Sequence, residues 1–542
     1  MAPTEARAPD TVTVAIPDLS AFASPLAKAE ILLQSAAEVE HALMVQYLYA
    51  TYSLKVPREV TDAAQKAVLN ESSAKGWPQV LLGIAREEMG HLMTVQNMLL
   101  LLGLAPNFER EDFPPRKDLY PFALHLEPLS QQSLAKYVVA EAPSGAADID
   151  DIVVLASETA HATINRVGVL YGLLGLVLAT EDQVEPGASG DPEWDAIVRG
   201  LAAAAHQQAP PDAWHLADGD FHPESLARQA DPQDWQVADL RVHRMADRAA
   251  AVQAIRDIGE QGEGPTTADE LSHFARFRGI FRGADGAVPF PAPGAWVPTR
   301  NVPTDPRVQD IADPRTRRWA ELGDLRYGLL LGFLEHYLVT PDDDRSVLVG
   351  WIFAEMRSRL GYIARELTRM PRTDAGGGEE AATAVPGGVA AIAFTLPAQL
   401  HLPADEPARW DLHRERTEAA IAKVQEMQAA DAKDGQDPYL ADTLASDRAR
   451  LALMTELTPA RPIPTSFARD ILPLFRPKDV QHMSFQGVDL RTYDRVKDRA
   501  EQILERVRAT PQDGQMPPPT DQRWTTAQTD LLARWIAEGS PP

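Results

Sequence analysis

Long segments of helical periodicity are the feature that most restricts how this chain can fold. Residues 27–54 and 79–102 carry apolar side chains at steps of three and four, the spacing of one face of an α-helix. Similar segments cover about 150–180 and 240–260, and the last breaks at "GEQGEGP" before resuming over 268–283. Several long amphipathic helices predict a helical bundle, so the expected fold class is all-α.

The length of 542 residues exceeds one ordinary hydrophobic core, so several domains are expected. Composition and periodicity predict an N-terminal tail at 1–26 and a bundle at 27–371 with polar, Pro-rich insertions at about 183–239 and 284–316. After the bundle they predict a linker at 372–388, a helical or irregular extension at 389–460, and a small module at 462–542. The later part of the bundle is expected to contain helices at about 317–338 and 345–369.

Charge and cysteine content narrow the classes of function. A formal net charge of −26 disfavours binding to nucleic acids and to anionic membranes. The longest apolar stretch, residues 167–179, is shorter than the roughly 20 residues that span a bilayer, and the first residues lack a secretory pattern, so a cytoplasmic protein is expected. Without cysteine, a metal ion must be held by carboxylates and imidazoles.

Glutamate and histidine recur three positions apart, which places both side chains on one face of a helix. The pairs are Glu38/His41, Glu88/His91, Glu158/His161 and Glu270/His273. Composition alone would give about one such pair. Inward-facing pairs on several helices can bind non-haem iron or manganese, whereas the ordinary alternative is a solvated helix face or an internal hydrogen bond. Glu88/His91 is the strongest pair, because it lies among apolar residues and unpaired burial would be costly.

Several motifs carry a family resemblance. "EVEHALMVQYLYA", "REEMGHLM", "IGEQGEGP" and "ELSHFARF" together resemble the ferritin-like family that includes the iminophenyl-pyruvate dimer synthase of violacein biosynthesis. The resemblance spans about 27–370. It implies a ferritin-like four-helix bundle and a non-haem metal-dependent oxidase or oxygenase of secondary metabolism. Its substrate would be a small amino-acid-derived or aromatic molecule, and its chemistry would include the oxidative coupling of imines.

The resemblance also implies a set of site residues. The metal ligands it implies are Glu40 with Glu38 as its alternative, Glu88, His91, Glu270 and His273, with Glu260 and Glu263 as further candidates, and Tyr47 is the implied catalytic residue. The implied cofactor is iron, with manganese and haem as alternatives.

One position departs from the family pattern. The family's third helix carries Gly-Glu-aromatic-Tyr, but "VGVLYG" places Val169 where the acid should be. Glu158 lies eleven residues earlier, about 16 Å along the helix axis, and cannot replace it. Loss of this bridging acid predicts about one metal ion per chain. Glu263 and Glu260 are the next candidates if two ions bind.

The C-terminal module resembles a bacterial cytochrome c without its cysteines. In "KDVQH", Lys478 and Gln481 occupy the cysteine positions, His482 is retained, and Met516 precedes Pro-Pro as the second axial ligand would. Haem cannot be attached covalently, so we expect a module that serves packing or docking. The alternative is non-covalent haem held by His482 and Met516.

Three functions remain open from the sequence. They are a non-haem metal oxidoreductase, a haem-dependent oxidative coupling enzyme, and a metal-free helical scaffold that binds a partner through the C-terminal module. An iron-storage shell is disfavoured, because the insertions would obstruct a closed symmetric assembly. The expected partners are a small-molecule substrate and either a second copy of the chain or another enzyme of the same pathway.

Overall fold

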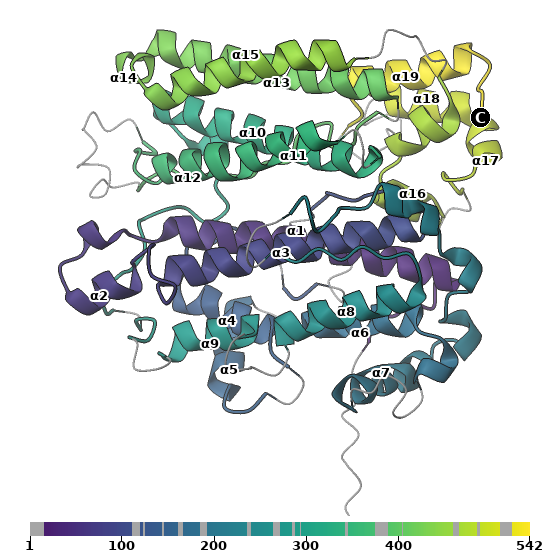
Figure 1. Cartoon of the computed structure of the whole chain (residues 1–542), viewed down its shortest axis with the longest axis horizontal. Helices are drawn as coiled ribbons and strands as arrows, with labels where there is room; N and C mark the ends of the chain where they lie inside the picture. Colours follow the sequence, from purple (N-terminus) through teal and green to yellow (C-terminus); the bar gives the residue numbers. More distant parts are fainter. Residues whose placement is uncertain are drawn as a thin grey trace, which may run out of the picture. The chain divides into compact units, whose positions relative to one another are not determined.

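The computed structural model describes residues 16–110, 120–122, 125–143, 146–160, 166–184, 192–235, 240–263, 271–283, 288–292, 294–341, 345–373, 388–403, 405–458, 465–484, 488–509 and 523–542. The chain divides into two compact units, Met1–Arg300 and Asn301–Pro542. Within the described residues every regular element is a helix (Figure 1), apart from two isolated bridges between Leu54 and Thr299 and between Pro371 and Val389. The expected all-α fold class is confirmed.

Two unbroken helices form the backbone of the first unit. Helix α1 (Pro25–Ser53) packs along α3 (Trp77–Leu101), and each has a proline in its first turn, where the missing N–H leaves no hydrogen bond unmade. The Ser24 side chain caps α1 by accepting from the Ala27 amide. Both helices are buried around most of their circumference, so they form the centre of the unit.

The opposite layer consists of two pairs of shorter helices. Helix α4 (Gln131–Ala140) packs against α9 (His273–Arg282), and α6 (Val167–Leu178) packs against α8 (Arg248–Glu263). In Figure 1 these two pairs follow one another along α1 and α3. The third and fourth positions of the bundle are therefore each interrupted, and four helix ends lie near one level of α1 and α3.

The helix expected over 150–180 is two helices. Helix α5 (Asp150–Ala160) and α6 are separate, because Arg166 ahead of α6 has extended backbone angles. The insertion expected at 183–239 contains a 14-residue helix, α7 (Pro192–Ala205), which packs on α6. The helix expected over 240–260 does not break at the start of "GEQGEGP" as expected, because α8 continues through Gly259 and Gly262 to Glu263, and the next helix, α9, begins at His273.

The second unit contains another group of four helical segments. Helix α10 (Pro314–Val339) packs against α13 (Glu406–Ala430), which packs against α15 (Pro438–Leu457). The fourth segment runs from α11 (Ser346–Phe353) through a π-helical turn, η9 (Ala354–Leu360), into α12 (Gly361–Leu367). The boundary between units lies at Arg300, and within the second unit α10 packs with α11, α12 and α13.

Buried charges hold the second group of helices together. Arg326 on α10 contacts Asp447 on α15 with Nη1–Oδ1 at 2.9 Å, and Arg450 contacts Glu355 on η9 at 2.6 Å. Arg326 and Glu355 complete the quartet at 3.5 Å. All four side chains are buried, so each charge depends on its partners.

The C-terminal residues of the second unit form their own apolar core. It includes Phe467, Ile471, Val496, Leu532 and Trp535. The elements that contribute to this core are the helical turns η10 (Phe467–Ile471) and η11 (Leu472–Leu474) and the helices α17 (Tyr493–Lys497), α18 (Ala500–Arg508) and α19 (Thr526–Ala537). The exposed His482 lies on α16 (Pro477–Ser484), and Met516 lies outside the described residues. The resemblance of this module to cytochrome c stays a prediction.

In the part of the chain that the structure describes, none of the helices has both the length and the apolar character required to cross a bilayer.

Candidate metal centre

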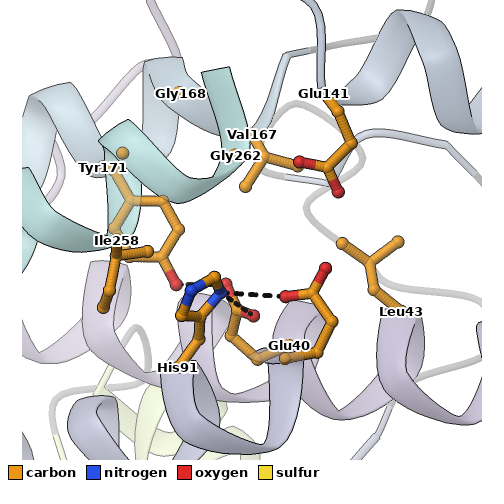
Figure 2. Close-up of a pocket in the computed structure, with 11 residues that line it drawn as sticks. Glu40, Leu43, His91, Glu141, Val167, Gly168, Tyr171, Ile258 and Gly262 are labelled. Atoms are coloured by element: carbon orange, nitrogen blue, oxygen red, sulfur yellow. Dashed lines mark hydrogen bonds and ion pairs between the residues drawn. The ribbon is translucent and has the colours of Figure 1, made fainter. Parts of the chain in front are cut away.

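Glu40 on α1 and the Glu88-x-x-His91 pair on α3 meet inside the first unit (Figure 2). Nδ1 of His91 lies 2.9 Å from Glu88 Oε2 and 3.4 Å from Glu40 Oε2. All three side chains are buried. Because α1 and α3 pack against each other, these donors are held by two buried, adjacent helices.

Glu141 and His273 approach from the opposite layer. Glu141 directly follows α4 and His273 begins α9, so both stand where the interrupted helices end. Nδ1 of His273 lies 3.2 Å from Glu88 Oε1 and 3.6 Å from Glu141 Oε2. An aromatic cluster holds α4 and α9 over α1, because the rings of Tyr137 and Phe277 each have their centroid 4.9 Å from that of Tyr47.

Glu88 is shared between two groups of potential metal ligands. In each group, one donor atom per residue lies within 4.8 Å of the others: Glu40, Glu88 and His91 form the first group, and Glu88, Glu141 and His273 form the second. One oxygen of Glu88 faces each histidine. This is the arrangement expected of a carboxylate that bridges two metal ions.

The outer nitrogen of each histidine is occupied, which leaves Nδ1 directed at the carboxylates. His91 donates from Nε2 to Gln261 Oε1 at 2.9 Å. His273 donates from Nε2 to Glu87 Oε2 at 2.8 Å, and Arg276 Nη1 donates to Glu87 Oε1 at 2.9 Å. Metal-binding histidines in proteins are commonly oriented in this way.

Tyrosine hydroxyls occupy one oxygen of each outer carboxylate. Tyr171 on α6 donates to Glu40 Oε1, and Tyr47 donates to Glu141 Oε1 at 2.9 Å. The second oxygen of each glutamate then faces its histidine. The two outer glutamates are thus prepared to offer one oxygen each.

Three buried atoms at the centre of the site are left without a hydrogen bond. Within the described residues, Glu40 Oε2, Glu88 Oε1 and His273 Nδ1 have no partner of acceptable geometry. Leaving buried polar atoms unsatisfied is costly, and metal ions bound by the two ligand groups would satisfy all three. Carboxylate and imidazole donors suit iron and manganese, so the residues present fit such ions.

A comparison with known families agrees with this geometry. Residues 33–282 match the family model described as Ferritin-like. This segment is a ferritin-like domain. The dichlorochromopyrrolate synthase of Lentzea aerocolonigenes is 26% identical over 376 residues, which is 62% of this chain and 34% of the relative. The chain thus spans about a third of that relative's length. No solved structure matches the chain.

Burial and crowding shift the proton affinities at the centre of the ferritin-like domain. Burial, together with the neighbouring Glu88, raises the pKa of Glu40 to about 8. Burial alone would lower the pKa of His91, but hydrogen bonds and charges from Glu40 and Glu88 raise it to about 10. The metal-free site therefore holds protons that a bound metal ion must displace.

A pocket opens onto the site (Figure 2). The lining residues are Glu40, Leu43, Glu88, His91, Glu141, Val167, Gly168, Tyr171, Ile258, Gly259 and Gly262. Acidic and imidazole groups form one wall, and apolar side chains and glycines of α6 and α8 form another. A Cβ on Gly262 would lie 3.1 Å from Glu141 Oε2, so glycine here leaves room for that carboxylate.

The structure brings some of the sequence-predicted residues together and places others elsewhere. Glu40, Glu88, His91 and His273 converge, and Tyr47 contacts the site through Glu141. Glu38 instead accepts from Asn107 Nδ2 at 3.3 Å and from Tyr120. Its pair partner His41 faces the Glu109 carbonyl at 3.3 Å. Of these two acids on α1, Glu40 is the one in the ligand group.

The remaining acidic candidates either lie outside the two ligand groups or belong to the residues that the structure does not describe. Glu260 on α8 is exposed, as is Glu158 on α5. The side chain of Glu263, at the end of α8, and the whole of Glu270 lie outside the described residues. Their predicted role as ligands stays a prediction.

Glu141 was missed from the sequence because α4 was not recognised as a helix. Leu134, Tyr137 and Val138 give it a helical face, and the Ser130 side chain caps it by accepting from the Ser133 amide. Glu141 brings a further buried acid to the ligand groups from the end of α4, whereas Val169 on α6 offers none. No local signal identifies Gln261, because its contact with His91 spans 170 residues.

Proposed function

We propose that the ferritin-like domain binds two non-haem metal ions, iron or manganese, and oxidises a small amino-acid-derived or aromatic substrate. The observation that carries this proposal is the pair of ligand groups that share Glu88. Such ions, when bound, supply electron transfer to dioxygen or peroxide. The name of the relative as a synthase supports a biosynthetic role.

The residues of the chain have definable tasks in such a reaction. Glu40, Glu88, Glu141, His91 and His273 hold the ions, and Tyr47 and Tyr171 fix the free oxygens of the outer glutamates. Leu43, Val167 and Ile258 line the pocket and exclude water from the reacting atoms. The apolar wall suits the hydrophobic part of an aromatic substrate.

Oxidative coupling of two imines is the reaction class that we propose. Forming one carbon–carbon bond between two imine molecules releases two protons and two electrons. Dioxygen or hydrogen peroxide would accept them. The buried carboxylates are the proton acceptors available at the pocket wall.

The other two functions lack a specific observation in their favour. The haem alternative depends on His482, which is exposed, and on Met516, which the description does not include. A metal-free scaffold does not account for the buried glutamates and histidines that face one another, because burying these polar side chains without a ligand costs free energy.

Metal analysis tests the proposal directly. The full chain, made metal-free and reloaded with Fe²⁺ or Mn²⁺ without oxygen, should hold two ions per chain by elemental analysis. Glu88→Gln should remove both, because Glu88 belongs to both groups. The matched control is Glu260→Gln, an exposed acid on α8, which should keep two ions. Wild-type protein that binds no metal would reject the proposal.

Substrate chemistry is tested on the same preparations. Aromatic α-imino acids, generated in place by an amino-acid oxidase, should be consumed with formation of a coupled product of doubled carbon skeleton, detected by mass spectrometry. Glu88→Gln should abolish the product and Glu260→Gln should not.

A further inference from the structure

The two ligand groups differ in what holds their histidines. We call Glu40, Glu88 and His91 the pocket half-site, and Glu88, Glu141 and His273 the inner half-site. In the pocket half-site, the neutral Gln261 accepts from His91 Nε2 at 2.9 Å. In the inner half-site, the carboxylate of Glu87 accepts from His273 Nε2 at 2.8 Å.

The difference in partner changes the strength of each histidine as a ligand. A carboxylate that accepts from one imidazole nitrogen makes the other nitrogen more basic, and removing such a partner typically weakens metal binding by about 10- to 100-fold. A neutral amide does this less. Glu87 is itself fixed by Arg276 on α9, so the hydrogen bond to His273 has a defined geometry.

The two half-sites also differ in access. All three ligands of the pocket half-site line the pocket, whereas the inner half-site contributes Glu88 and Glu141 to the lining but not His273. Both histidine side chains are buried, so the lining of the pocket is what distinguishes them. A ligand entering the pocket meets the half-site that has the weaker histidine.

We propose that the inner half-site binds its metal first and more tightly, while the pocket half-site binds a second, more readily exchanged ion that contacts the substrate. The inference rests on the proposed function, because it assumes that both groups bind metal. Glu87 and Gln261 act as positioning residues that set this order, and neither touches the ion.

Titration of the metal-free full chain with Co²⁺ tests the order, with calorimetry for affinity and visible absorption as a signature of coordination. Wild-type protein should show two steps that differ by about 10- to 100-fold in dissociation constant. His91→Ala should keep the tight step and lose the weak one. His273→Ala should lose the tight step.

Two exchanges of the outer partner provide matched variants. Glu87→Gln should weaken the tight step by about 10- to 100-fold, so that both steps become similar, and Gln261→Glu should tighten the weak step. Arg276→Gln is the control, because it breaks the ion pair with Glu87 but leaves the carboxylate on His273. It should weaken the tight step less than Glu87→Gln does, because the carboxylate stays on His273 and loses only the cation that fixes it, and folding is checked by thermal unfolding.

The possible failures are distinguishable. Two equal steps in wild-type protein would overturn the order while leaving the proposed function intact. The order would also be overturned if Glu87→Gln weakened only the step that His91→Ala removes, or if Arg276→Gln acted as Glu87→Gln does. Absence of any Co²⁺, Fe²⁺ or Mn²⁺ binding would reject the proposed function itself.

Discussion

Glu87 and Glu88, adjacent on α3, contact opposite nitrogens of one imidazole. Glu87 Oε2 lies 2.8 Å from Nε2 of His273, and Glu88 Oε1 lies 3.2 Å from Nδ1 of the same ring. Glu87 orients the ring through Nε2, and Glu88 faces Nδ1, the nitrogen that remains available to a metal ion. The "EE" of "REEMGHLM" therefore has two separate tasks, which explains why two acids occupy the buried face of a helix.

The tyrosine on the pocket side should matter for turnover more than its counterpart. Tyr171→Phe removes the hydrogen bond to Glu40 and leaves a buried carboxylate oxygen unsatisfied, which should lower the free energy of unfolding of the metal-free protein by about 1–3 kcal/mol. Turnover should fall as well, because the orientation of Glu40 beside the substrate is lost. Chemical denaturation and product formation measure the two effects.

Tyr47→Phe is the matched comparison. This substitution removes the equivalent hydrogen bond to Glu141, at 2.9 Å, but Tyr47 is not among the described residues that line the pocket. We expect a similar loss of stability with a smaller loss of turnover. A larger loss of turnover in Tyr47→Phe would instead favour the catalytic role that the sequence assigns to Tyr47.

Much of the ferritin-like bundle could be predicted because the sequence patterns that specify it lie within single helices. The apolar periodicity of α1 and α3 and the Glu88-x-x-His91 spacing can be read within single helices. The choice between Glu38 and Glu40 could not be predicted, because both are buried on α1. They differ in their contacts with distant segments, since Glu38 accepts hydrogen bonds from Asn107 and Tyr120. Gln261, Glu87 and Tyr171 acquire their roles through contacts between distant segments.

The glycine beside Glu141 should be sensitive to a single methyl group. In Gly262→Ala the new Cβ would lie 3.1 Å from Glu141 Oε2, so the carboxylate must move from the position in which it faces His273. Co²⁺ binding at the inner half-site should weaken by about 10-fold or more, in line with a disturbed ligand environment. Calorimetric titration measures this effect.

Gly200→Ala on α7 is the control for this substitution. A Cβ there meets nothing within 4 Å, so removing a helical glycine should stabilise the protein by about 0.5–1 kcal/mol without altering metal binding. Unchanged metal affinity in Gly262→Ala would show that Glu141 does not need its present position.

Acid should destabilise the first unit through His41. Burial, with the charge of Arg110, lowers the pKa of His41 to about 3, whereas the unfolded chain takes up this proton near pH 6.5. The unfolded state therefore binds more protons between these values, so stability is complete above about pH 6.5 and is lost as the pH falls toward 3. The loss from this residue is at most about 5 kcal/mol.

Equilibrium unfolding of wild type and His41→Gln at several pH values isolates this contribution. Carboxylates and the buried His336 of the second unit, whose pKa burial lowers to about 3, titrate in the same window in both proteins, so the difference between the two curves reports His41. Parallel curves would show that His41 is protonated in the folded protein or remains unprotonated in both states.

The buried charge quartet of the second unit should respond strongly to loss of one member. Arg326→Met leaves Asp447 without its closest cation and removes one partner of Glu355, all inside a core from which water is excluded. Breaking a buried ion pair in this way typically costs about 3–5 kcal/mol, because a charge remains without compensation. The midpoint of urea unfolding of the second unit should fall accordingly.

The control is Arg357→Met, which replaces an exposed arginine on the same π-helical turn as Glu355. It should change the free energy of unfolding by less than about 0.5 kcal/mol. Metal binding in the first unit should be the same in both variants, because none of these residues belongs to the ligand groups. A stable Arg326→Met variant would mean that the quartet is replaceable by apolar packing, and the double variant Arg326→Met/Asp447→Leu should then be at least as stable as wild type.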